Sequence, residues 1–430
     1  MIKKIIALVI TLALFLAVPL YDVITNPASP IEFGAGDGVS EIIENPEKFK
    51  ELIASIPDVE AYLENETMLD VNPDFKSFTM VENGVRKESD RKLKGYGTDA
   101  YYEVEENSKD HVLEMYYADN ALYYHAVGQM TTSTEKYGAT FYENEYNYSY
   151  DFRWDDFRGG EREVKVYDIE IFYSKSMTLL KFNNYEMYTQ TSETEDKWKT
   201  VEADANDDQQ KVLAAFSKCY GKWMKLEAYT EAEIQQMIMD KYGITMDSNP
   251  EDYDEQTIID MQVEMMVYMT ASQVSEAYIA DINNSNKMNA AYLQAIAGFM
   301  TTDTDVNFDK SGNRYELKEG IEYKQKYVKM LNVGYGYDTE SPNRVSVAFN
   351  VNAADVSVEQ AFKVSSKYDS TYGEQRTLEV SALSSFKNVG NTIANVKDED
   401  VKSVYDVLGG ALEPVIYDML MGGSDEGGND

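Results

Sequence analysis

Two long stretches of this chain alternate apolar and polar residues with a period of two, and this pattern decides the fold class. The first stretch runs from about residue 75 to 201 and is rich in Tyr. Between Tyr167 and Tyr173 the odd positions are apolar, while Asp168 and Glu170 lie on the other side. Such alternation is typical of antiparallel strands that face a core on one side and water on the other.

The turn residues of these stretches predict how the strands pair. Asp119-Asn120 lies between two alternating runs, Leu113–Tyr117 and Leu122–Ala126, which predicts a hairpin. Strand-like sequence resumes after residue 303, and Val345 to Val351 alternates without a break. Neither set of strands has a second apolar layer of its own to cover its apolar side. We therefore predict that residues 70–202 and 303–382 form one continuous curved sheet.

Between the two sets of strands, residues 207–300 change to the 3.6-residue period of helices. A first helix is predicted from an apolar stripe, and Thr230 with Glu233 forms a capping box for a second helix that Gly243 ends. Two further helices are predicted over Ile258–Ile282 and around Met288–Phe299. The stripe of the first helix consists of Val212, Phe216, Cys219 and Trp223.

This helical insertion is rich in methionine. Nine of the 20 Met lie between Met237 and Met300. Met is flexible and polarizable, so it suits a surface that repacks around apolar ligands, and it also fills irregular gaps in a core.

The predicted fold class is α+β: a large curved antiparallel sheet, similar to a half-barrel, packed on helices and interrupted by the helical insertion. The predicted parts of the folded body are an N-terminal helix with the first part of the sheet at 41–202, the insertion at 207–300, the second part of the sheet at 303–382, a C-terminal helix at 398–421 and a disordered acidic tail at 422–430.

The N-terminus has the pattern of an export signal. Lys3 and Lys4 precede an uncharged run from Ile5 to Tyr21. Positive charge before such a run directs the rest of the chain out of the cytoplasm. Residues 1–25 are predicted to be a signal peptide or an N-terminal membrane anchor with a transmembrane helix, followed by a linker at 26–40. We expect an extracytoplasmic protein, either secreted or anchored by this segment.

Charge and cysteine content exclude several classes of partner and site. The net charge is −37, so a nucleic-acid partner is not expected, because phosphate binding needs a concentrated basic surface. The single cysteine, Cys219, rules out an internal disulfide and is expected to be an inert buried thiol.

Two local stretches resemble the LolA/LppX-like bacterial envelope proteins. One is the hairpin Tyr117–Tyr123, and the other is the Phe362–Val380 segment, which is similar to the closing hairpin of that family. The resemblance implies a curved sheet wrapped as a half-barrel around helices, and an acyl chain or glycolipid as ligand. Many members carry a lipidated Cys, which this chain lacks.

Few residues suggest chemistry. His111 and His125 lie in predicted strands and match no catalytic or zinc signature, so we expect cross-strand or solvent-facing polar pairs. The positions Asp305, Asn307, Asp309 and Glu316 have the spacing of an EF-hand calcium loop, but Lys310 replaces the turn glycine, which favours a hairpin.

These observations favour a non-enzymatic binding protein that holds an apolar or amphipathic, lipid-like ligand. We predict no catalytic residue, metal or cofactor, and the ligand-binding residues stay undefined. A carbohydrate-binding or adhesion module is the alternative, because 34 Tyr can stack on sugars. A glycosidase-like hydrolase is the second alternative, since Asp155-Asp156 beside Trp154 would suit a cleft.

Overall fold

The computed structural model of the chain describes most of the predicted sheet and helices. The described residues are 78–95, 100–118, 121–144, 147–174, 176–195, 197–202, 208–245, 253–300, 308–312, 314–318, 344–351, 355–369, 374–387 and 401–422. The predicted signal or anchor at 1–25, the linker at 26–40, the N-terminal helix and the tail from residue 423 lie outside them.

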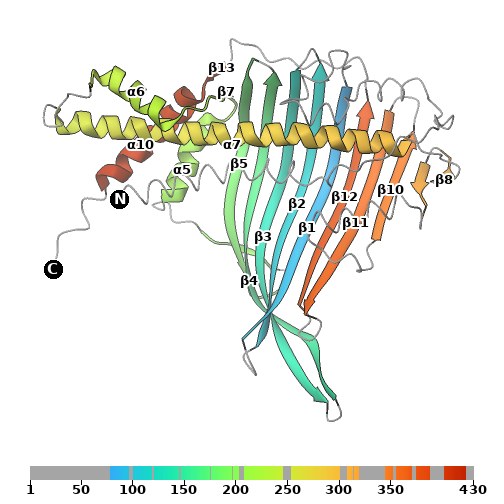
Figure 1. Ribbon diagram of the computed structural model, residues 1–430. Helices are drawn as coiled ribbons and strands as arrows, with labels where there is room; N and C mark the ends of the chain where they lie inside the picture. Colours follow the sequence, from blue (N-terminus) through green and yellow to red (C-terminus); the bar gives the residue numbers. More distant parts are fainter. Residues whose placement is uncertain are drawn as a thin grey trace, which may run out of the picture.

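The strands form a single 13-stranded sheet (Figure 1). Its order is β13-β7-β5-β4-β3-β2-β1-β12-β11-β10-β9-β8, and β6 pairs with β5. The strands are β1 Phe78–Lys94, β2 Tyr101–Ala118, β3 Ala121–Asn144, β4 Asn147–Ser174, β5 Thr178–Ser192, β6 Lys199–Thr200, β7 Trp223–Lys225, β8 Phe308–Ser311, β9 Arg314–Leu317, β10 Arg344–Val351, β11 Asp355–Asp369, β12 Glu374–Lys387 and β13 Val401–Ser403.

The two sets of strands meet where β1 pairs antiparallel with β12, with Arg86 opposite Val380. This pairing confirms the prediction of one continuous sheet, and the architecture is α+β with a large curved sheet. The prediction of an entirely antiparallel sheet was wrong, because β13 runs parallel to β7. A parallel pair arises here because a long crossover, not a hairpin, separates the two strands.

The predicted hairpins are present. Ala118 of β2 pairs with Ala121 of β3, so the two antiparallel strands are only two residues apart in the chain, as the predicted hairpin requires. In the second part of the sheet Asp309 pairs with Glu316 across the β8–β9 hairpin, where Gly312 has a positive φ of 61°. A hairpin therefore replaces the helix–loop–helix arrangement that an EF-hand needs.

The helices of the insertion and the C-terminus are α5 Asp208–Phe216, the 3-10 turn η2 Ser217–Cys219, α6 Glu231–Tyr242, α7 Glu255–Met300 and α10 Val404–Gly422. Helix α6 confirms the predicted caps. Thr230 and Glu233 bond reciprocally as a capping box, and Gly243 ends the helix in the left-handed conformation.

Two helix predictions were wrong. The two helices expected within 258–300 are one continuous helix, α7, of 46 residues. The polar run Asn283–Asn286 contains neither Gly nor Pro, so it weakens the helix without breaking it. Trp223 belongs to strand β7 and not to the first helix, because Gly221, with φ 72°, turns the chain before it.

The C-terminal segment was also predicted differently. Residues 401–403 form β13, so α10 begins at Val404 and then continues through Pro414. Among the described helices none is both long and apolar enough to cross a membrane. This corrects the transmembrane-helix prediction for the part of the chain that the structure describes.

Helices α5 and α7 pack on one side of the sheet, which we call the helix face. Phe182 of β5 contacts Phe216 of α5 and Tyr278 of α7, with ring centroids 4.8 and 6.0 Å apart. Figure 1 shows α7 crossing this side of the strands. In the register of the sheet the helix face also carries Leu113, Ala126 and Ile169, all buried.

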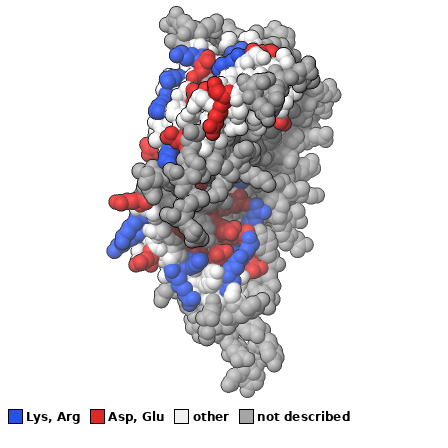
Figure 2. Space-filling view, turned by 90° about the vertical axis from the view of Figure 1, so that its left-hand side faces the viewer, with Lys and Arg blue, Asp and Glu red and all other residues white. Residues whose placement is uncertain are grey.

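Charged side chains of both signs intermingle on the side of the molecule shown in Figure 2, over the described residues. Among the described residues, Lys225 and Glu227 form one such pair of opposite charges, 2.7 Å apart. Local pairing of this kind is how a surface with a large acidic excess keeps its basic residues close to carboxylates.

Candidate functional site

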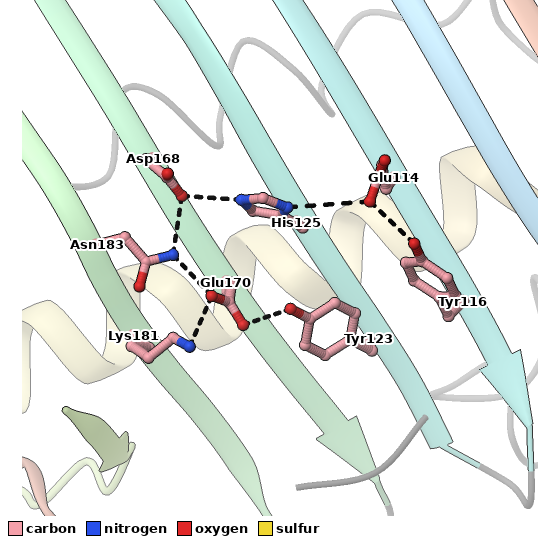
Figure 3. Close-up of polar contacts among 8 residues, drawn as sticks. All are labelled: Glu114, Tyr116, Tyr123, His125, Asp168, Glu170, Lys181 and Asn183. Carbon is pink, nitrogen blue, oxygen red and sulfur yellow. Dashed lines mark hydrogen bonds and ion pairs between the residues drawn. The ribbon is translucent and has the colours of Figure 1, made fainter. Parts of the chain in front are cut away.

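The side of the sheet opposite α7, which we call the opposite face, carries a group of polar side chains on β2–β5 (Figure 3). Apart from Tyr116, each one is next in its strand to a buried apolar residue of the helix face. We call this group the polar cluster. It consists of Glu114, Tyr116, Tyr123, His125, Asp168, Glu170, Lys181 and Asn183.

His125 lies at the centre of the polar cluster between two carboxylates. Its Nε2 is 2.9 Å from Asp168 Oδ1, and its Nδ1 is 4.0 Å from Glu114 Oε2. The hydroxyl of Tyr116 donates to the same Glu114 oxygen at 2.9 Å. His125 is thus a cross-strand bridge between β2 and β4, and its two ring nitrogens face acids on both sides.

Glu170 accepts more hydrogen bonds from protein side chains than the other carboxylates of the polar cluster. Asn183 and Lys181 each donate to Oε1 at 2.6 Å, and the Tyr123 hydroxyl donates to Oε2. Burial opposes ionisation of Glu170, but these three hydrogen bonds outweigh it and hold the pKa of this carboxyl below its usual value. Burial and the bond to Glu170 raise the pKa of Tyr123, so the hydroxyl stays a donor.

Asn183 reaches the polar cluster because of a bulge in β5. The register between β4 and β5 shifts between Asp168 and Ile169, which leaves Asn183 without an opposite residue. Its amide then donates to both Asp168, at 2.9 Å, and Glu170, at 2.6 Å. The bulge thereby lets one side chain join two carboxylates that would otherwise repel each other.

Aromatic rings border the polar cluster. Tyr123 lies between Tyr116 and Trp223, with interplanar angles of 66° and 62°. The Lys181 ammonium is 4.8 Å from the centroid of the Trp223 ring. The rings are tilted and share their polar neighbours, so they do not form the parallel shelf that sugar stacking would need.

Below the apolar rows near α7, the helix face carries rings laid over glycines. A Cβ on Gly84 would lie 2.5 Å from the His111 ring, and a Cβ on Gly128 would lie 2.7 Å from the Tyr167 hydroxyl oxygen. In the register Gly84, His111, Gly128 and Tyr167 are neighbours on β1 to β4. Glycine is required at Gly84 because a larger residue would displace the His111 ring, and at Gly128 because it would also meet the Asp110 carbonyl oxygen at 2.5 Å.

One register step further from α7, the helix face becomes basic. Arg86 of β1 is opposite Lys109 of β2, and Lys165 of β4 is in the same row, with Met130 of β3 between them. Lys109 is 4% exposed, and the side chains of Lys165 and Arg86 are 11% and 17% exposed. We call Arg86, Lys109 and Lys165 the basic row.

Carboxylates flank the basic row on its far side. Glu88 lies 3.5 Å from Arg86, and Glu163 lies 2.8 Å from Lys165. Arg376 of β12 also donates to Glu88, from Nε at 2.8 Å and from Nη2. One carboxylate is thus shared by two guanidinium groups, while on the α7 side His111 pairs with Glu82 at 3.1 Å.

The remaining predicted candidates do not join either group. Cys219 is fully buried, its thiol donates to the Val407 carbonyl at 3.5 Å, and burial raises its pKa to about 11. Trp154, Asp155 and Asp156 lie in β4, but their side chains fall outside the described part. Asp305 and Asn307 are also outside it.

No metal site is found among the described side chains, where no three His, Cys, Asp or Glu residues are placed to hold an ion. Four methionines lie in the first half of α7. Met261, Met265, Met266 and Met269 are half-exposed, and they precede Tyr278, the residue that contacts the sheet. They therefore lie toward α6 and α10, beyond the edge of the sheet (Figure 1).

Comparisons with protein-family models, with curated proteins and with solved structures give no match.

Proposed function

We propose that the chain is an extracytoplasmic, non-enzymatic binding protein that holds an amphipathic, lipid-like ligand against the helix face of its sheet. The sheet would act as a half-barrel, with the ligand in its hollow and α7 across it. The observation that carries the proposal is the gradient along the helix face. Within three register steps it passes from apolar residues such as Phe182, through rings over glycines, to the buried basic row.

This gradient supports a ligand with two chemically different parts. Apolar rows next to α7 favour an acyl chain, because burial of apolar surface is the main source of affinity for such ligands. The rings laid over Gly84 and Gly128 give a smooth surface between the two parts. A core with no ligand role gains little from charged side chains buried a few residues away from its centre.

The resemblance to LolA/LppX-like envelope proteins agrees with this proposal, because those proteins hold acyl chains or glycolipids. The polar cluster, in contrast, has its donors and acceptors satisfied by one another. It therefore fits a structural role on the opposite face better than a ligand site.

Native mass spectrometry of the full chain, purified without detergent, tests the proposal. We expect adducts of discrete mass. Extraction with organic solvent should remove them, and incubation of the extracted protein with an oleoyl lipid should restore an adduct. A chain of unmodified mass that also fails to take up any oleoyl lipid would refute the proposed function.

A further inference from the structure

We propose that two copies of this chain pair antiparallel with each other through the outer edge of strand β4, over residues 147–157 and centred on Phe152. The beginning of β4 and the end of β3 form a hairpin that extends beyond the rest of the sheet (Figure 1). We call this hairpin, residues 139–144 and 147–157, the arm. The inference concerns self-association, and it does not depend on the ligand proposed above.

The outer edge of β4 loses its neighbouring strand where the arm begins. Strand β5 pairs with β4 as far as Ser192, which is opposite Gly160. The chain then turns back along β5, where the Ser192 hydroxyl donates to the Lys197 carbonyl at 2.7 Å and Thr191 pairs with Lys199 of β6. Among the described strands, none pairs with β4 on this side before Gly160. Such an edge presents unpaired amide and carbonyl groups to another strand.

The base of the arm is anchored in a small core. Tyr137 of β3 is opposite Phe157 of β4, and their ring centroids are 5.5 Å apart with an interplanar angle of 75°. Tyr137 also packs against the buried residues Ala100 and Tyr102. The register of β3 and β4 shifts on both sides of Tyr137, and such bulges bend a strand pair away from its sheet. An edge that is already held in place loses less conformational freedom when it binds.

The sequence of this edge is complementary to itself. Aromatic and polar residues alternate in its central part, Tyr150-Asp151-Phe152-Arg153-Trp154. In an antiparallel pair centred on Phe152, each Asp151 is opposite Arg153 of the other copy, and each Tyr150 is opposite Trp154. Opposite charges and aromatic pairs are the cross-strand pairs that stabilise antiparallel sheets. A pair centred one residue away would instead place two Asp151 or two Arg153 opposite each other.

The other edge of the arm does not have this complementarity. Residues 139–144 of β3 contain a single charged residue, Glu143, and no basic residue. A pair formed through β4 also has two-fold symmetry, so both copies use the same edge and the assembly closes as a dimer.

The net charge of −37 on each copy opposes association. The arm reduces this repulsion, because it extends beyond the other strands and contact at its edge keeps the two sheets apart (Figure 1). Exposed charges more than about 10 Å apart are largely screened at about 0.1 M salt. The short-range pairs between Asp151 and Arg153 then decide whether the copies associate.

Sedimentation equilibrium of the full chain in about 0.15 M salt tests the inference. We expect a reversible equilibrium between monomer and dimer. Asp151→Arg and Arg153→Asp are each expected to weaken the dimer about tenfold or more, because like charges then lie opposite each other at two positions. An equimolar mixture of the two variants pairs opposite charges again, and so does the double variant. Both are expected to restore the dimer.

Glu161→Arg is the matched control for the change of charge. Glu161 is exposed and lies on β4, but it is opposite Thr134 of β3 and Thr191 of β5, so its edge is already paired. This variant should dimerise as the wild type does, and circular dichroism verifies that every variant is folded. A wild-type chain that is monomeric at about 0.1 mM contradicts the inference. It is also contradicted by association that the two single variants leave unchanged, or that their mixture does not restore.

Discussion

The two faces of strands β2–β5 use the same backbone in opposite ways. On the helix face the side chains are held by close packing: Phe182 packs against two aromatic rings, and the His111 ring lies over a glycine. On the opposite face, one residue away, the strands are joined by reciprocal charges and hydrogen bonds. The adjacent pairs that differ in this way are Leu113 and Glu114, Ala126 and His125, Ile169 and Glu170, and Phe182 and Lys181.

This difference teaches which changes each face tolerates. A close-packed face responds to changes of volume, since neighbouring atoms cannot fill a gap or yield to an added one. A hydrogen-bonded face responds to changes of donor number and protonation. A one-residue slip of register would exchange the two sets of residues, so both faces together fix the pairing of these strands.

Removal of the Phe182 ring, which contacts both α5 and α7, should destabilise the helix face most. Phe182→Ala is expected to lower the free energy of unfolding by about 3–5 kcal/mol, because the ring is fully buried between Phe216 and Tyr278. Urea denaturation, monitored by circular dichroism, measures this change in the free energy of unfolding. Lys181→Ala, the next residue but on the opposite face, serves as the comparison with an expected loss of about 1–2 kcal/mol. Equal losses would mean that the faces do not differ as described.

Added volume should be equally informative. Gly84→Ala is expected to cost about 1–3 kcal/mol, because the new methyl group would meet the His111 ring at 2.5 Å. His111→Ala in the same chain should restore most of this loss in a double-mutant cycle. At Gly128 the nearest atom is the Asp110 carbonyl oxygen, also at 2.5 Å, so Tyr167→Ala should not rescue Gly128→Ala. Rescue at both glycines, or at neither, would contradict this assignment.

The opposite face should respond to pH and not to volume. Glu170→Gln is expected to cost about 1–2 kcal/mol at pH 7, because three donors face the carboxylate. Since folding lowers the pKa of Glu170, its ionised form stabilises the fold above the ordinary value of 4.5. That contribution is lost as the pH falls through the lowered folded pKa.

Urea denaturation from pH 7 to pH 3 tests this dependence, with Glu161→Gln, an exposed position on the same strand, as the control. The difference between the wild type and Glu170→Gln should shrink toward the acidic end. A difference that stays constant with pH would exclude the proposed role of the charge.

The smallest effect is expected for an exposed ion pair on the opposite face. Lys87 and Glu106 lie 2.6 Å apart, but the lysine side chain is 48% exposed. Lys87→Ala should lower the free energy of unfolding by no more than about 0.5 kcal/mol. This difference should vanish in about 1 M salt, where charges are screened over about 3 Å. A loss above that of Glu170→Gln would reverse the ranking of the two environments.

Much of the fold follows from local patterns. The β2–β3 hairpin was predictable because Asp119-Asn120 is flanked by alternation, and α6 because Thr230, Glu233 and Gly243 mark its ends. The joining of the two strand sets was predictable from the need to cover an apolar side. In each case the information lies within a few residues or in a global rule about burial.

The errors have non-local causes. Strands β7 and β13 are three residues each and form through partners distant in the chain. Strand β7 pairs with β5, and β13 pairs with β7 across about 175 residues, so no local alternation marks them. Helix α7 continues through its Asn-rich run because that run contains neither Gly nor Pro, and a lower helix propensity alone does not end a helix.

The polar cluster and the basic row depend on register, which is why neither was predicted. The pairing of Ala118 with Ala121 places Glu114 opposite His125, so this contact was within reach of the sequence. Between β3 and β4, however, the register shifts three times before His125 meets Glu170, and a further bulge places Asn183. The net charge of −37 also gave no indication of a local basic group, because its three residues come together only in the folded sheet.

The pairing of β1 with β12 has a consequence for how the protein is made. Strands β1 to β5 follow one another in the chain, so they can pair as hairpins while synthesis continues. Strand β12, in contrast, is synthesised nearly 300 residues after β1. Until then the 17-residue edge of β1 presents unpaired amides and carbonyls to any passing strand. We therefore expect nascent chains stopped before residue 374 to aggregate or to require a chaperone, whereas chains released after residue 387 should not.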